Sequence, residues 1–492
     1  MGIKTMWKLV EPSVDRQYAL STISVQHGFL ARPGCRTYRL GVDASVWLAE
    51  VRNTFLARHA RYGRSPELRT LLFRLMRLLA MTVAAVFVFD GPQRPSIKRG
   101  THVVRRTDWL EDDFMKMIRA FGFDVHAAPG EAGAELAKMQ QLGLIDVAVT
   151  DDSDIFVFGA SAVIRSTSLF GKVNKADFYQ KDRLTAAQPI GFSRGVFVLI
   201  ALLCGGDYGP VGLPGCGITT AYGLAGYNLG EELCNAVISL HDTELTVFLD
   251  EWRDQLRLCL LKDPKGYIGR RHPALAAAVP CTFPDPRIAT RYICPVMTDF
   301  QPNCGLAEFR LPDITSIAQF CELNFMWSSK ARLSDEFRLN LWPGLLLRLL
   351  INDTLDRDGV AGNKAFGKLL TWEIHAVAHS EDVQLRVAAG TVEKVIASAV
   401  LGIWGAERVQ YIRGVSEQVM QELDDITLDN SATRPPRPNR IHTISVPRAV
   451  LLRACPRFEV ALNTLSMRLC ERLIQSGHVT EEAGSADLVC TR

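Results

Sequence analysis

Three short apolar runs in the first half of the sequence are each followed at once by aspartates, and this pattern restricts the possible folds more than any other feature. The runs and their acids are residues 38–42 with Asp43, residues 84–89 with Asp90, and residues 145–150 with Asp152 and Asp154. Residues 68–81, 105–121 and 129–142 carry apolar side chains at helical spacing. Alternation of buried strands with amphipathic helices is typical of a mostly parallel sheet covered by helices on both faces. The sequence therefore predicts an α/β fold.

The aspartates after the strands are expected to lie together, because the carboxyl ends of parallel strands meet at one edge of a sheet. Glu131, in the first turn of the helix predicted to begin at Pro129, would join them. Asp207, after the apolar helix predicted at 191–204, would close the ring. Such carboxylates repel one another, and the usual remedy is a hard divalent cation such as Mg²⁺. Two ions roughly 4 Å apart would flank a scissile phosphodiester.

Each of these acids also has an ordinary structural interpretation. An aspartate after a strand often forms a turn or caps a helix, and a glutamate in a first helical turn suits the helix dipole. The repetition of acids at successive strand ends favours a shared site over these separate roles.

The charge balance does not by itself indicate a partner. The chain holds 56 Lys and Arg residues against 53 Asp and Glu residues, a net charge of +3, so local patches would have to bind any nucleic acid. We find no apolar run long enough to span a membrane. The 12 cysteines include no CxxC pair, which indicates reduced thiols inside the cell rather than a zinc module or a disulfide framework.

The second half of the chain is organised differently. A glycine-rich turn at 212–217 separates the helix at 191–204 from a small-residue helix predicted at 218–224. The glycines of such a turn permit close backbone approach to a phosphate, although they are as often only structural. A further helix is predicted at 342–350, and β-branched runs between 364 and 460 indicate a small, mainly β domain.

Six motifs in order along the chain resemble the XPG-type flap-endonuclease superfamily of structure-selective nucleases. They are MGI with Trp7, VDASVW around Asp43, FVFDG around Asp90, PGEA around Glu131, TDDSD at 150–154 and GGDY around Asp207. Within the superfamily, the chain is most similar to eukaryotic Holliday-junction resolvases of the fungal form. Residues 283–295 and 336–350 resemble the tail of that nuclease core, and residues 371–460 are more weakly similar to its chromodomain.

This resemblance implies a fold and a domain order. The fold is a mostly parallel sheet flanked by helices (a PIN-like nuclease core) with a helix-two-turn-helix, plus a small C-terminal chromodomain-like domain that is mainly β. The expected divisions are an N-terminal nuclease region at 1–100, an internal nuclease region with a short arch at 101–210, the helix-two-turn-helix and core tail at 205–362, the chromodomain-like domain at 364–465 and a tail at 466–492.

The implied activity is that of a nuclear, Mg²⁺-dependent endonuclease that cuts four-way junctions by symmetric paired nicks and also accepts 5′ flaps and forks. Two Mg²⁺ ions are expected, with Mn²⁺ as a substitute and K⁺ at the helix-two-turn-helix. The protein would be a monomer that dimerises on the junction. Asp90 and Glu131 lie only 41 positions apart, which leaves little chain for a closed arch that threads a free end.

The resemblance also assigns residues. The expected metal ligands are Asp43, Asp90, Glu131, Asp152, Asp154 and Asp207. Lys98 and Arg105, which with Glu131 make the expected catalytic set, would contact the scissile phosphate, where cations offset developing charge. Both could instead belong to a solvated, DNA-contacting helix start. The expected DNA-backbone contacts are Gly2, Gly212, Gly215, Gly217, Thr219 and Thr220.

The chain departs from the family pattern at one acid. The family has two acids separated by one residue, but the second position after Glu131 here is Gly133, so an expected ligand is missing. Glu135 lies one helical turn beyond Glu131 on the same face and is a possible substitute. Gly133 keeps a second interpretation open, a catalytically weakened or silent scaffold that binds DNA or RNA. A 5′ flap endonuclease or exonuclease sibling is a third.

Overall fold

The computed structural model describes residues 2–55 without 4 and 17, 65–102 without 96 and 99, 109–169, 175–186, 190–359 without 302, 303, 326, 328 and 329, 372–377, 382–388 and 441–454. Within these ranges, no helix is both long enough and apolar enough to cross a membrane. The predicted tail at 466–492 and most of the predicted domain at 364–465 lie outside the described residues.

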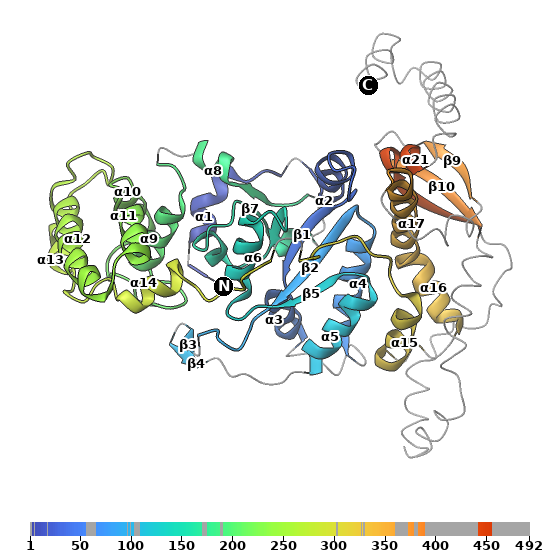
Figure 1. The fold of residues 1–492 in the computed structure, drawn as a ribbon, viewed down its shortest axis with the longest axis horizontal. Coiled ribbons are helices and arrows are strands. Elements are labelled where there is room, and N and C mark those ends of the chain that lie inside the picture. The colour runs from blue at the N-terminus through green and yellow to red at the C-terminus, as the bar shows by residue number, and fades with distance from the viewer. Residues whose placement is uncertain are drawn as a thin grey trace, which may run out of the picture.

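The described strands of the nuclease-like region form a six-stranded sheet in the order β5-β2-β1-β6-β7-β8. Their bounds are β1 Tyr38–Asp43, β2 Val83–Phe89, β5 Asp124–Ala127, β6 Val147–Val149, β7 Ala162–Ile164 and β8 Phe178–Gln180. Every neighbouring pair is parallel except β7 and β8. The predicted α/β class with a mostly parallel sheet is confirmed (Figure 1).

Helices cover both faces of this sheet because side chains alternate along each strand. On β2, Phe87 packs in the core beneath helices α3, α4 and α5, whereas Val88 packs in a second core with α1 and α6. Both residues are fully buried. The helices of this region are α1 Met6–Val10, η1 Glu11–Ser13, α2 Leu20–Ile23, η2 Ser24–Leu30, α3 Ala44–Phe55, α4 Pro66–Leu79, α5 Trp109–Ala120, α6 Ala132–Gln141, η4 Ser153–Phe156, α7 Ser166–Leu169 and α8 Lys181–Ala186. A small hairpin joins β3 (Ile97–Lys98) to β4 (Thr101–His102).

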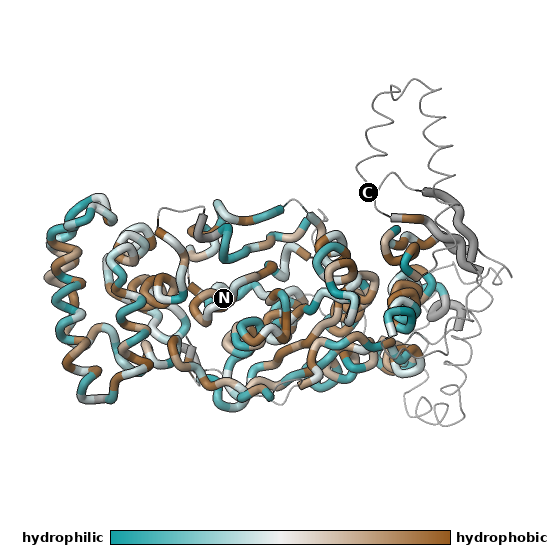
Figure 2. Tube along the Cα trace, turned by 45° about the horizontal axis from the view of Figure 1, so that its top comes forward, coloured by the Kyte–Doolittle hydropathy of each residue, from teal (hydrophilic) through white to brown (hydrophobic). Residues whose placement is uncertain are grey.

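A helical lobe, residues 190–301, extends from the second core at the left of Figure 1. Its helices are α9 Arg194–Cys204, α10 Ile218–Ala225, α11 Leu229–Ser239, α12 Asp242–Lys262, α13 Pro273–Ala277 and α14 Pro286–Ile293. The apolar helix α9 packs against α10, α11 and α14. The long helix α12 alternates between hydrophilic and hydrophobic stretches at the outer end of the lobe (Figure 2). The loop between α9 and α10, where the helix-two-turn-helix is predicted, contains a tight turn in which the Cys216 N–H donates to the Leu213 carbonyl (3.0 Å).

Three helices lie on the opposite side of the molecule and complete the first core. They are α15 Ile314–Phe325, α16 Lys330–Asn340 and α17 Trp342–Arg357. The described part of the C-terminal region adds an antiparallel sheet in the order β11-β10-β9, with β9 Trp372–Val377, β10 Asp382–Ala388, β11 Ile441–Pro447 and helix α21 Arg448–Ala454. Asp358, after α17, forms ion pairs with Arg36 (2.6 Å) and Arg453, which tie α21 to the core.

One helix boundary differs from the prediction at a position that matters for the site. The helix expected from Pro129 begins at Ala132, and Glu131 is its N-cap residue. The cause is a tertiary contact with the loop after β2. There the Gln93 N–H donates to the Pro129 carbonyl (2.8 Å), and the Gly91 N–H donates to the Gly130 carbonyl (2.7 Å). A backbone held in this way does not continue the helix toward its N-terminus.

Candidate functional site

The parallel strands β1, β2 and β6 place their following acids at one edge of the sheet. Asp43 is the last residue of β1 and pairs in register with Val88, two residues before Asp90. Asp152 and Asp154 come from the turn after β6, where η4 begins. The carboxylates expected from sequence at three strand ends are therefore neighbours across adjacent strands.

Asp43 is the most buried member of this group, with 4% of its surface exposed. Its Oδ1 accepts a hydrogen bond from the Val46 N–H (3.1 Å), and its Oδ2 accepts one from the Thr150 hydroxyl (2.9 Å). Burial, together with the nearby charges of Asp90 and Asp152, raises the pKa of Asp43 to about 7. The acids therefore repel one another as they stand, and a bound cation would relieve that repulsion.

Asp90 connects β2 to the start of α6. Its Oδ1 accepts a hydrogen bond from the Ala132 N–H (2.9 Å), and its Oδ2 pairs with Arg94 (3.1 Å). A carboxylate at a helix N-terminus is stabilised by the helix dipole. Asp90 therefore fixes the position of Glu131, the residue immediately before this helix.

Glu131 is held by a tyrosine from the helical lobe. Its Oε2 accepts a hydrogen bond from the Tyr208 hydroxyl at 2.6 Å, and the Tyr208 ring packs on Tyr292 with centroids 4.5 Å apart. Burial and the Glu131 carboxylate raise the pKa of the Tyr208 hydroxyl far above its ordinary value, so it remains a donor. Asp207, beside it, is buried. Sequence reasoning missed Tyr208 as a site residue, although the GGDY motif contained it.

The segment that precedes α1 lies against Asp152 and Asp154. The Ile3 N–H donates to the Ser153 hydroxyl (2.8 Å), and Gly2 has a positive φ of 78°. A Cβ at Gly2 would lie 2.4 Å from a carboxylate oxygen of Asp152 and 2.7 Å from one of Asp154. The structure therefore gives Gly2 a packing role beside the acids, while its predicted DNA contact stays a prediction.

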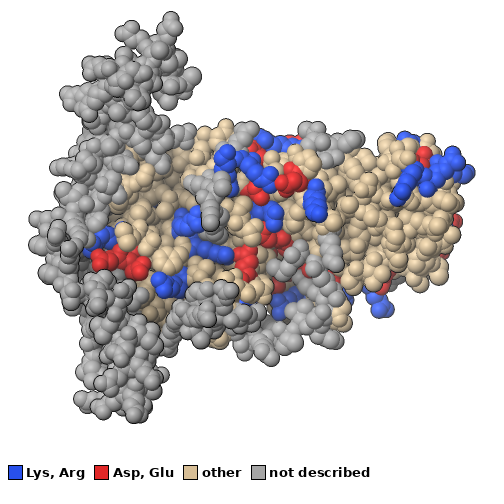
Figure 3. Space-filling view, turned by 180° about the vertical axis from the view of Figure 1, so that it is seen from behind, with Lys and Arg blue, Asp and Glu red and all other residues tan. Residues whose placement is uncertain are grey.

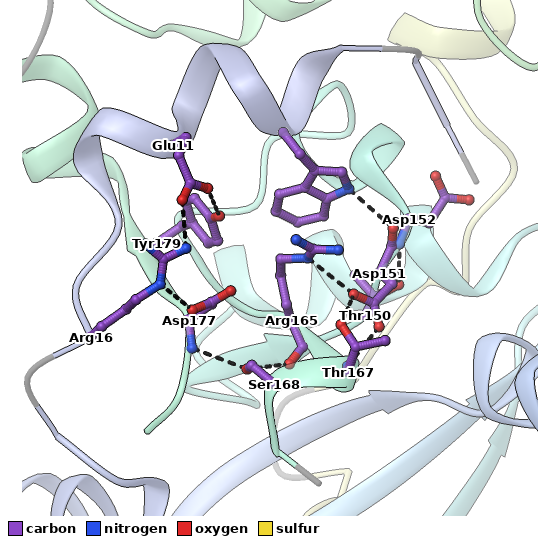
Figure 4. Close-up of polar contacts among 11 residues, drawn as sticks. Glu11, Arg16, Thr150, Asp151, Asp152, Arg165, Thr167, Ser168, Asp177 and Tyr179 are labelled. Atoms are coloured by element: carbon purple, nitrogen blue, oxygen red, sulfur yellow. Dashed lines mark hydrogen bonds and ion pairs between the residues drawn. The ribbon is translucent and has the colours of Figure 1, made fainter. Parts of the chain in front are cut away.

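Helix α1 is fixed in this place by a network around Trp7 (Figure 4). The Trp7 indole N–H donates to the Asp151 carbonyl (3.2 Å), and the Arg165 guanidinium lies 4.8 Å from the indole ring centroid. Arg165 also pairs with the Asp151 carboxylate (3.1 Å), which accepts hydrogen bonds from Thr167 as well. Asp151 therefore has a structural role, because it fixes Arg165 and Thr167 beside Trp7.

The donor set fits magnesium chemically, because all six expected ligands offer carboxylate oxygens. Among the described residues, however, no three acids, histidines or cysteines come close enough to hold one ion together. Their side chains are oriented by protein partners instead: Arg94 at Asp90, Tyr208 at Glu131, and the Asp154 N–H at Asp152.

Glu135, the possible substitute for the acid that is missing at Gly133, is engaged away from the acids at the strand ends, which counts against that role. Its Oε1 lies 2.7 Å from the His126 Nε2, and its Oε2 accepts a hydrogen bond from the Thr298 N–H (3.0 Å). Glu135 is fully buried in this cluster. Its two oxygens are engaged by β5 and by the segment after α14, not by the acids at the strand ends.

The two predicted phosphate-contacting cations are only partly covered by the structure. The backbone of Lys98 lies in β3, paired with Thr101, and its side chain is outside the described part. Arg105 lies outside the described residues altogether. Their roles stay predictions.

The predicted DNA-contacting residues of the glycine-rich turn have different environments. Gly215, Gly217 and Thr219 are exposed at the start of α10. Gly212 has a positive φ of 59°, and a Cβ there would lie 2.5 Å from the Gly205 nitrogen, so it is required by packing against the end of α9. Thr220 is only 8% exposed, which leaves its hydroxyl little access to a DNA backbone.

A mostly parallel sheet, covered by helices and with carboxylates after adjacent strands, defines the PIN-like nuclease fold. Residues 1–111 match the XPG N-terminal domain, and residues 122–207 match the XPG I-region. These two matches cover the nuclease-like region of the chain and support membership of the XPG-type flap-endonuclease superfamily, with a relation to the eukaryotic Holliday-junction resolvases.

Individual relatives agree with this assignment. Flap endonuclease GEN homolog 1 of Homo sapiens is 28% identical over 252 residues, which cover 47% of this chain and 26% of the relative. The match thus spans about a quarter of that protein's length. A crystal structure of the Holliday junction-resolving enzyme GEN1 with product DNA, Mg²⁺ and Mn²⁺ is 25% identical, has a TM-score of 0.65, and covers 94% of this chain and 99% of that chain. A eukaryotic junction-resolving enzyme GEN-1 that binds potassium has the same identity and coverage and a TM-score of 0.66.

Proposed function

We propose that this chain is a Mg²⁺-dependent, structure-selective DNA endonuclease that resolves four-way junctions by symmetric paired nicks. The observation that carries the proposal is the gathering of carboxylates from β1, β2 and the turn after β6 at one edge of the sheet. The raised pKa of Asp43 supports it, because a cluster that repels itself is suited to cations. The similarity to GEN1 with product DNA and Mg²⁺ supports DNA as the substrate class.

Each side chain then has a distinct task. The residues that would hold the ions are Asp43, Asp90, Glu131, Asp152, Asp154 and Asp207. Bound Mg²⁺ supplies an acidified water and stabilises the charge on the leaving oxygen. Tyr208 orients Glu131 before the ions bind. Lys98 and Arg105 steady the scissile phosphate.

The finer assignments belong to the same proposal. Two Mg²⁺ ions act at the site and Mn²⁺ can replace them, as the ions in the similar GEN1 structure suggest. K⁺ binds at the turn before α10, in line with the potassium-binding relative. The substrates include 5′ flaps and forks as well as junctions, and the protein is a monomer that dimerises on the junction. The proposed location is the nucleus, and the proposed domain divisions are those given by the sequence.

A second candidate function rests on Gly133. A chain that lacks one expected ligand could retain branched-DNA binding without cleavage and act as a scaffold. The six remaining acids argue against this candidate, because a scaffold gains nothing from mutual repulsion. Side-by-side cleavage assays on flap and junction substrates would distinguish a flap endonuclease sibling from a resolvase.

The test is cleavage of an end-labelled four-way junction in Mg²⁺ by the chain and by Asp152→Asn. The amide oxygen can still accept from the Asp154 N–H, so the local fold should persist. We expect cleavage to be abolished and junction binding to be retained. The matched control is Asp254→Asn on α12, whose side chain is 79% exposed, and it should cut normally. Residual cutting by Asp152→Asn near the parent rate would refute the metal assignment.

A further inference from the structure

Residues 262–272, from the last residue of α12 through the loop to α13, concentrate positive charge at the outer end of the helical lobe; we call this segment the basic loop. Its cations are Lys262, Lys265, Arg270 and Arg271, and all four are exposed. Against one acid they give a net charge of +3, as large as the net charge of the entire chain. In Figure 3, Lys and Arg side chains gather at the far right, the end of the molecule formed by α12 and α13.

The one acid of the basic loop is turned inward and used to shape it. Asp263 accepts hydrogen bonds from the Ile268 N–H (3.1 Å), the Gly269 N–H (2.9 Å) and the Tyr227 hydroxyl (2.6 Å). These bonds hold the pKa of Asp263 below its ordinary value, although partial burial opposes them. The carboxylate therefore organises the loop backbone instead of pairing with the four cations.

The basic loop is fixed against α10, the helix that follows the glycine-rich turn. The Tyr227 and Tyr267 rings meet edge to face, with centroids 5.1 Å apart. A Cβ at Gly223 would lie 2.7 Å from the Tyr267 carbonyl oxygen, so the loop backbone contacts the helix directly. Since α10 has eight residues and a length of about 12 Å, the loop lies within roughly four base-pair steps of the glycine-rich turn.

We propose that the basic loop is a second binding site for the phosphate backbone of duplex DNA, along the junction arm that the glycine-rich turn holds. This inference rests on the proposed function, because it takes branched DNA as the substrate. Exposed cations on a rigid loop next to a backbone-binding turn suit the regular spacing of phosphates along a duplex. An acidic protein partner would not require the cations to lie next to α10, so their placement favours duplex DNA.

The test compares Arg270→Gln/Arg271→Gln with Lys116→Gln/Arg119→Gln, a matched control that removes two exposed cations from α5 on another part of the molecule. Binding of a long-armed four-way junction is measured as a function of salt. Each phosphate contact contributes about 0.9 to the slope of log K against log salt, so the loop variant should lose about two units of slope. If the affinities are equal near 1 M salt, that of the loop variant should fall roughly 60-fold near 0.1 M salt, whereas the control should match the parent.

A junction whose arm is shortened by about six base pairs should weaken parent binding as the loop variant does, and the two effects should not add. Equal salt slopes for parent and loop variant would overturn the inference, even if junctions are cut normally. If the parent binds junctions but cuts none, the proposed function fails while the slopes still decide the role of the loop. If the parent binds RNA duplexes or acidic proteins but no DNA, both proposals fail. Unchanged thermal unfolding of both variants excludes misfolding as the cause.

Discussion

Replacement of Gly133 by glutamate should restore the missing ligand and lower the Mg²⁺ requirement for cleavage. Gly133 is the second residue of α6, and its backbone is not in the left-handed region. A Cβ there would meet only the Phe158 ring, at 3.7 Å, which is ordinary contact. The position therefore accepts a side chain without displacing the backbone.

The size of the effect has two separable parts. Glycine in a helix costs about 0.5–1 kcal/mol relative to alanine, so Gly133→Ala should raise the free energy of unfolding by about that amount. Gly133→Glu gains a similar helix contribution, but the acids around Glu131 repel the new charge until Mg²⁺ binds. We expect Gly133→Glu to need roughly tenfold less Mg²⁺ for half-maximal cleavage, which corresponds to about 1.4 kcal/mol.

The assay is a Mg²⁺ titration of junction cleavage by the chain, Gly133→Ala and Gly133→Glu. The alanine variant is the matched control, because it orders the helix without adding a ligand. If alanine lowers the Mg²⁺ requirement as much as glutamate does, helix order is the cause and the ligand reasoning is refuted. If only Gly133→Glu cuts, the metal site is assigned correctly, and the chain with Gly133 binds DNA without cutting it. If neither the chain nor the glutamate variant cuts while both bind tightly, the scaffold is the better description.

Tyr208→Phe should lower the cleavage rate about tenfold at unchanged junction affinity. It removes the hydrogen bond that orients Glu131, a contact of roughly 1.5–3 kcal/mol. An unchanged cleavage rate would contradict this role. Asp358→Asn should destabilise the fold at pH 7 in denaturant unfolding. Its ion pair with Arg36 lowers the pKa of Asp358 to about 2 from 3.8, so the difference from the parent should be present above pH 4 and vanish as the pH falls through 2. A difference that persists at lower pH would show that the charge is not the cause. Gly2→Ala should impair cleavage, measured on the same junction, because its Cβ would collide with the acids; parent-like activity would refute that packing role.

The central strands and their acids could be predicted because their signals are local. β2 is a continuous apolar run buried on both faces, and β1 is buried except for the half-buried Arg39; the acid stands at the end of β1 and directly after β2. Because parallel strands bring their carboxyl ends to one edge of the sheet, the sequence pattern alone predicts that these acids lie at the same edge. By contrast, β7 and β8 have three residues each, too few to show any periodicity.

The details within the site depend on tertiary contacts that no local pattern records. Glu131 is an N-cap because a loop from β2 captures the preceding carbonyls. Glu135 lies on the expected helical face but is taken by His126, which comes from β5. Tyr208 reaches Glu131 from the helical lobe, across 77 positions of chain. Helical spacing predicts which residues share a face, but it does not predict their partners.

The hydrogen bond between Tyr208 and Glu131 joins the helical lobe to the acids at the edge of the sheet. Tyr208 belongs to the segment that continues into the glycine-rich turn, and the Leu213 N–H bonds back to the Leu203 carbonyl (2.9 Å). A shift of that turn on a duplex would therefore move the hydroxyl that orients Glu131. A DNA shape that displaces the turn would then misplace Glu131, so discrimination between DNA shapes would act on the position of this carboxylate as well as on the binding of the arms.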